Sequence, residues 1–146
     1  MYPVHRNDAD ILNTIYQNSR MAFDCTERVI RRCRSKELRE YLKRQKSRYS
    51  DSCREARTRL VSGGAEIRPV PVIQSAMAGM GIFMKTAFDR RKGHIAELMY
   101  NGTNMGIIDI ARSVNHSRNA SPETIQLAEA LMSKEEEYAN ELRKFL

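Results

Sequence analysis

The stretch from residue 94 to residue 116, HIAELMYNGTNMGIIDIARSVNH, restricts the possible folds most strongly, because its apolar residues recur at the period of a helix. One face of that helix collects Ile95, Met99, Gly102, Gly106, Ile110 and Ser113. Each interior glycine costs about 1 kcal/mol of helix stability relative to alanine. We therefore expect a neighbouring backbone to approach closely at Gly102 and Gly106. Polar residues interrupt the run, so we do not expect a membrane helix.

The whole chain has the length and composition of one soluble unit. Its 146 residues suit a single domain, 1–146. The beginning, MYPVHRNDAD, lacks the hydrophobic segment of a secretory signal, so we expect a cytoplasmic protein. The cysteines Cys25, Cys33 and Cys53 are odd in number and form no CxxC pair, which predicts buried thiols rather than disulfides.

The first half of the chain predicts a helical hairpin. Apolar residues recur at helical spacing from residue 8 to about residue 34, with Asn7 or Asp8 as the N-terminal cap. A second amphipathic helix should run from residue 36 to residue 61 and end at Gly63 and Gly64. Because the break at Arg34 is only a few residues long, the two helices must lie antiparallel.

The second half predicts two more long helices. Residues 65–71 contain two prolines and should be extended, and residues 72–88 should be partly helical. After the helix at residues 94–116, Ser121 and Pro122 have the residue types of a helix cap and first position, and the last helix should continue to Leu146. The fold class is therefore all-α: a four-helix bundle with one long crossover between the second and third helices.

Five segments resemble the ferritin-like superfamily: DILNTIYQNSRMAFD, the hairpin ending in SGG, the crossover segment that follows it, ELMYNGTNMGIID and EEEYANELRKFL. The chain looks most similar to an uncharacterised group of bacterial ferritin-like proteins, catalogued only as a domain of unknown function. The resemblance implies a ferritin-like four-helix bundle with a short extra helix in the crossover.

The resemblance does not extend to the metal ligands. Metal-active ferritin-like proteins use a Glu on each of two helices and Glu-x-x-His on each of the other two. None of the three histidines here has a glutamate three residues before it. The inner polar positions are Asn18, Gln45, Tyr49, Asp109, Glu135 and Tyr138. We expect a hydrogen-bonded polar layer without catalytic residues or a cofactor. The alternative is an atypical iron or manganese site that uses Glu135 and Asp109 with water.

A basic surface is predicted on the first hairpin. Thirteen Lys or Arg residues and four Asp or Glu residues lie between Arg28 and Arg59. The candidate polyanion-binding residues are Arg31, Arg32, Arg39, Lys43, Lys46, Arg54 and Arg57. Such clustering is typical of phosphate binding, although charge alone says little about function and a solvated helix face has the same pattern. Nucleic-acid or polyanion binding is therefore a second alternative.

A methionine-rich stripe in the crossover is the remaining candidate surface. It comprises Met77, Met80, Met84 and Phe88. Flexible thioethers suit adaptable contacts, so the stripe should cover one side of the bundle or form a homodimer interface. Taken together, the sequence predicts a non-catalytic, dimeric bacterial protein with a structural or interaction role, whose protein partner the sequence does not identify.

Overall fold

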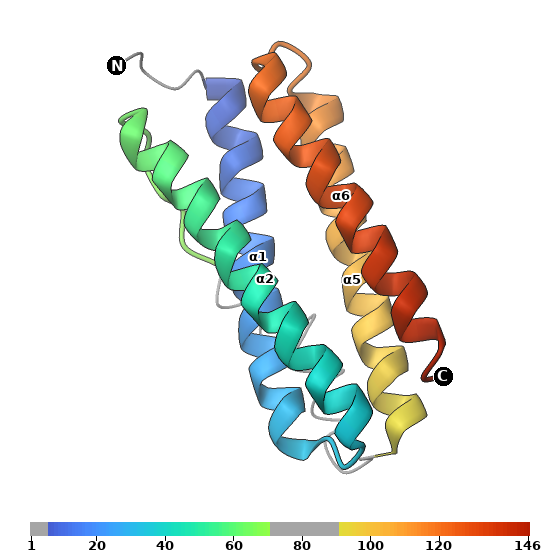
Figure 1. Cartoon of the computed structure of the whole chain (residues 1–146). Helices are drawn as coiled ribbons and strands as arrows, with labels where there is room; N and C mark the ends of the chain where they lie inside the picture. The colour runs from blue at the N-terminus through green and yellow to red at the C-terminus, as the bar shows by residue number, and fades with distance from the viewer. Residues whose placement is uncertain (1–5, 71–90) are drawn as a thin grey trace.

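The computed structural model describes residues 6–70 and 91–146, which form two pairs of antiparallel helices packed as a bundle (Figure 1). The helices are α1 (Arg6–Arg32), α2 (Lys36–Ser62), α5 (Lys92–His116) and α6 (Pro122–Arg143). The prediction of an all-α four-helix bundle is confirmed. In these two ranges no helix combines the length and apolar character that crossing a bilayer requires.

The methionine-rich stripe cannot be compared with the structure. Its residues, Met77, Met80, Met84 and Phe88, lie in the range 71–90, outside the described residues. The expected partial helix at residues 72–88 falls in the same range.

The helix ends follow the local residue types. The Ser35 side chain caps α2 by accepting a hydrogen bond from the Leu38 backbone N–H at 3.3 Å. Gly63 ends α2, and Gly64 follows it with φ of 71°, a left-handed conformation that favours glycine. Ser121 caps α6 by accepting from the Thr124 backbone N–H at 3.3 Å. The predicted break before α2, its glycine end and the cap of α6 are confirmed.

The start of α1 differs from the prediction. The helix already begins at Arg6, so the proposal that Asn7 or Asp8 caps it is wrong. The Asp8 carboxylate instead accepts a hydrogen bond from the Ser121 backbone N–H at 2.7 Å. Asp8 therefore ties the first turn of α1 to the start of α6, and its negative charge also suits the N-terminal end of the helix dipole.

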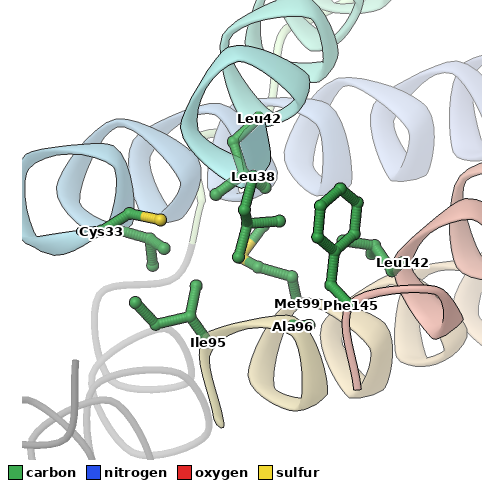
Figure 2. Close-up of a cluster of buried hydrophobic side chains, with 9 residues drawn as sticks. Cys33, Leu38, Leu42, Ile95, Ala96, Met99, Leu142 and Phe145 are labelled. Carbon is green, nitrogen blue, oxygen red and sulfur yellow. The ribbon is translucent and has the colours of Figure 1, made fainter. Parts of the chain in front are cut away.

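Three apolar clusters stabilise the bundle, and the two largest lie towards opposite ends. The first takes side chains from all four helices and includes Leu38, Leu42, Ile95, Met99 and Leu142 (Figure 2). The second includes Ile11, Ile15, Ala56, Ile110 and Ala128. Burial of this apolar surface is the main favourable term in folding. Between the two clusters, the middle level of every helix carries more polar side chains.

The two glycines of α5 do not mark a close helix crossing. Gly102 is exposed, and Thr103 takes the buried position instead. A β-carbon placed on Gly102 or Gly106 would meet none of the described atoms within 4 Å. The expected backbone contact is therefore wrong, because both glycines border open space. Among the described residues, no packing contact at either glycine offsets its cost to the helix.

Replacing Gly102 with alanine should stabilise the protein by about 0.5–1 kcal/mol, because alanine favours the helix and the added methyl group meets open space. Urea unfolding followed by circular dichroism measures the change. Gly64→Ala is the matched comparison and should cost about 1 kcal/mol, since its φ of 71° suits glycine alone. A loss of stability in Gly102→Ala would contradict the open space at that position.

Candidate functional site

A cavity of about 190 Å³ lies at the middle level of the bundle, between the two apolar clusters. Its apolar wall is formed mainly by Met21, Ala22, Val29, Leu98, Met99, Ile110 and Leu131. For comparison, an engineered apolar cavity of about 150 Å³ in another protein stays dry and binds benzene. The cavity is therefore large enough for a small organic molecule of about one ring.

The cavity meets the surface along α5. Asn101 and Gly102 belong to its lining and are exposed, and Met105 in the same lining is 48% exposed. α1 contributes Met21 and Ala22 to the same lining. The two glycines of α5 leave room here, which explains how the cavity can exist beside a continuous helix.

Four of the six predicted inner polar residues line this cavity. They are Asn18, Tyr49, Asp109 and Glu135. Asn18 is half-buried, and its Nδ2 donates to the Gly106 carbonyl oxygen at 3.5 Å. Asp109 is also half-buried. The structure thus brings together polar side chains from all four helices at one level.

Glu135 is the most unusual group of the site. Its side chain is buried, with 6% of the residue exposed. The Tyr49 hydroxyl donates to Glu135 Oε2 at 3.2 Å, whereas Oε1 has no hydrogen-bond partner in the described part of the chain. Burial raises the pKa of Glu135 to about 7, although the hydrogen bond from Tyr49 acts in the opposite direction.

Tyr49 and Tyr138 are buried close to this carboxyl group. Their rings meet edge to face, with centroids 6.2 Å apart. Burial raises the pKa of Tyr49, and the nearby Glu135 carboxylate raises it further, so the hydroxyl stays protonated as a donor. The Arg48 guanidinium lies 5.2 Å from the centroid of the Tyr138 ring. This arrangement fixes the position of Glu135 between α2 and α6.

Gln45 and Tyr138 lie outside the cavity lining and link helices instead. Gln45 Nε2 donates to the Tyr41 hydroxyl at 3.4 Å, and that hydroxyl donates to the Tyr138 carbonyl oxygen at 3.2 Å. Gln45 Oε1 is buried and has no hydrogen-bond partner within residues 6–70 and 91–146. These contacts join α2 to α6 next to the site, one turn away from Tyr49.

The described residues do not assemble a metal-ligand set of ordinary size. Within residues 6–70 and 91–146, no three His, Cys, Asp or Glu side chains lie close enough to hold one metal ion. Asp109 and Glu135, the weak metal candidates, share the cavity lining but no third carboxylate or imidazole joins them. A resident metal would therefore depend on water for most of its coordination sphere.

The predicted basic surface lies along α1 and α2, and local contacts occupy much of it. Lys43 pairs with Glu40 at 3.2 Å and Arg54 with Asp51 at 3.6 Å. Arg39 donates to the Cys33 carbonyl oxygen at 3.1 Å, and Lys46 lies 5.8 Å from the centroid of the Phe23 ring. The other candidates, Arg31, Arg32 and Arg57, are exposed. The structure distributes these charges along two helices rather than around one pocket.

Thr103 and Ser19 are lining residues that sequence reasoning missed. Both are small polar residues buried on helices, and Thr103 donates to the Met99 carbonyl oxygen of its own helix at 2.8 Å. The three cysteines are free thiols; Cys33 is buried, and Cys25 and Cys53 are half-buried. In comparisons with known proteins, no family model, no curated protein and no solved structure matches this chain.

Proposed function

We propose that this chain is a non-catalytic binding protein that holds a small, largely apolar molecule in the mid-bundle cavity. The observation that carries the proposal is the unpartnered Oε1 of Glu135, a buried oxygen beside an open cavity. Buried polar atoms in native proteins nearly always have a hydrogen-bond partner, and burying one without a partner is costly. A bound molecule with one donor group would supply that partner.

The chemistry of the lining supports binding rather than catalysis. Cys25 is the most nucleophilic residue type in the lining, but burial raises the pKa of its thiol. A protonated thiol is a poor nucleophile at neutral pH. No histidine stands among the described lining residues to act as its base. The cavity therefore offers shape and one polar anchor, as a binding pocket does.

We also propose that the bundle is a ferritin-like relative, and that it forms a cytoplasmic homodimer. The order of two antiparallel helix pairs, joined by a long connection over residues 63–91, supports this kinship. Sedimentation analysis tests the dimer directly, since a monomeric mass at micromolar concentration would contradict it.

Binding of small ring compounds tests the proposed function. We expect at least one of benzene, indole and 2-phenylethylamine to bind saturably, as followed by chemical shifts of the α5 and α6 amides. Gly106→Leu should weaken that binding at least tenfold, because the added side chain enters the cavity that Gly106 borders. Ala130→Leu places the same leucine side chain on the exposed face of α6 and should leave the affinity unchanged. Absence of binding by all three compounds would contradict the proposal.

Metal binding and polyanion binding, the two alternatives predicted from the sequence, are tested by separate experiments. Metal analysis of the purified protein tests the atypical iron or manganese site at Glu135 and Asp109, and about one metal ion per chain would favour it over the cavity ligand. Titration with double-stranded DNA at two salt concentrations tests polyanion binding, because neutralising phosphates makes affinity fall steeply with salt. The local pairing of Lys43 and Arg54 is why we place this function behind ligand binding.

A further inference from the structure

The charges around the cavity narrow the class of ligand. Among the described lining residues, Asp109 and Glu135 carry carboxyl groups, and none is Lys, Arg or His. A buried carboxylate that lacks an opposite charge is strongly disfavoured, and a positive guest would remove that penalty. The apolar wall therefore suits an apolar part of the ligand, and the carboxyl groups suit a positively charged part of the same molecule.

Among the described residues, the groups that line the cavity with Glu135 bring no positive charge to its carboxyl group. α2 contributes the Tyr49 hydroxyl, which occupies Oε2, and α1 contributes the Asn18 amide, whose Nδ2 donates to the Gly106 carbonyl. α5 contributes Asp109 and Thr103, and α6 itself contributes Tyr138. Among these groups there is no cation. The Arg48 guanidinium of α2 lies over the Tyr138 ring, 5.2 Å from its centroid.

The geometry of the carboxyl group selects the kind of cation. Because Tyr49 already donates to Oε2, Oε1 is the carboxyl oxygen that lacks a hydrogen-bond partner among the described residues. A guanidinium binds best through two parallel N–H bonds to both oxygens of a carboxylate. An ammonium group is a compact donor that needs only one of them. A single oxygen without a hydrogen-bond partner therefore suits an ammonium group better than a guanidinium.

We propose that the cavity takes an organic ammonium ion whose apolar body is about one ring in size and whose N–H donates to Glu135 Oε1. This proposal rests on the proposed function, since it names the chemical class of the cavity ligand. The apolar body lies against side chains such as Val29, Ile110 and Leu131. The Asp109 carboxyl and the Asn18 side-chain oxygen stand in the same lining as further acceptors for the remaining N–H groups.

Binding of an ammonium ion should also release protons. Because the pKa of Glu135 is about 7, a large share of the carboxyl groups is protonated at pH 6.5. The ammonium ion favours the ionised form, so the carboxyl proton leaves to the solvent as the complex forms. A neutral ligand brings no positive charge to the carboxyl group and should therefore release fewer protons. Proton release is therefore a signature of this cation that does not depend on any variant.

Three probes of similar shape test the proposal by calorimetry at pH 7.5: 2-phenylethylamine, which is an ammonium ion at this pH, neutral 2-phenylethanol and anionic 3-phenylpropionate. We expect the ammonium ion to bind at least about tenfold more tightly than the alcohol, and the anion to bind weakest. Glu135→Gln should reduce the preference for the ammonium ion to about twofold or less. The exposed neighbour provides the matched control, Glu136→Gln, which should keep the full preference.

The outcomes separate the two proposals. Equal affinity for the ammonium ion and the alcohol would overturn the ammonium assignment and leave the binding function intact. Failure of all three probes to bind would overturn the ammonium assignment, and it would overturn the binding function as well if benzene and indole also fail to bind. A preference that persists in Glu135→Gln would place the cation elsewhere. If Glu135→Gln does not fold, proton release by the unaltered protein at pH 6.5, measured in buffers of different ionisation enthalpy, decides instead: no release overturns the assignment.

Discussion

Replacing Glu135 with glutamine should raise the free energy of unfolding, relative to the unaltered protein, by about 3 kcal/mol more at pH 8 than at pH 4.5. The stability advantage of Glu135→Gln over the unaltered protein should grow by that amount between pH 4.5 and pH 8. The reason is that the variant removes a buried carboxyl group whose ionisation the fold resists. Urea unfolding followed by circular dichroism, repeated at several pH values, measures both curves.

The sign follows from proton binding. The pKa of Glu135 is about 7 in the folded chain against an ordinary value of 4.5, so the folded state binds more protons than the unfolded state between these two pH values. The contribution of Glu135 to stability is therefore fully present below about pH 4.5. It is lost as the pH rises through about 7 and stays lost above that. Other groups titrate in both proteins, so their contributions cancel in the difference.

Glu136→Gln is the control, because Glu136 is exposed on the next position of α6. Its stability should follow that of the unaltered protein within about 0.5 kcal/mol at every pH. Parallel curves for Glu135→Gln and the unaltered protein would show that the carboxyl group is not buried as described. The comparison thus tests the central feature of the site without any ligand.

The bundle could be predicted because its signals are local. The short break before Lys36, the cap at Ser121 and the glycines after Ser62 each act within a few residues, and the structure has all three. The start of α1 could not be predicted in the same way. Asp8 has the residue type of a cap, but the backbone N–H of Ser121, distant in the sequence, takes its carboxylate instead. A hydrogen bond between residues that are far apart in the sequence cannot be recognised from the residue types around either of them.

The sequence predicts several of the polar residues of the site, but it does not predict the cavity that they line. Helical spacing places Tyr49 and Glu135 on inner faces, and the structure joins them by a hydrogen bond. The cavity itself was missed, because Gly102 and Gly106 have the same spacing whether a backbone or open space lies beside them. Spacing shows which face of a helix is turned inward. It does not show how much volume the facing side chains leave empty.

Truncation of Leu42 to alanine should destabilise the protein by about 3 kcal/mol, within the 2–5 kcal/mol typical of fully buried leucines. Leu42 is 0% exposed in the apolar cluster that Figure 2 shows, where it packs with Leu38 and Leu142. Thermal or urea unfolding measures the loss. Leu146→Ala is the control, because Leu146 is 62% exposed and its truncation should cost less than about 0.5 kcal/mol.

The same variant separates stability from binding. Leu42 does not belong to the cavity lining, so the folded fraction of Leu42→Ala should bind 2-phenylethylamine with unchanged affinity. Glu135→Gln should show the opposite pattern to Leu42→Ala above pH 7. It should be more stable than the unaltered protein and should have a weaker preference for the ammonium ion. A buried carboxyl group that lowers stability while it serves a ligand is the expected cost of a binding site. Loss of affinity in Leu42→Ala would instead show that the cavity depends on the whole core.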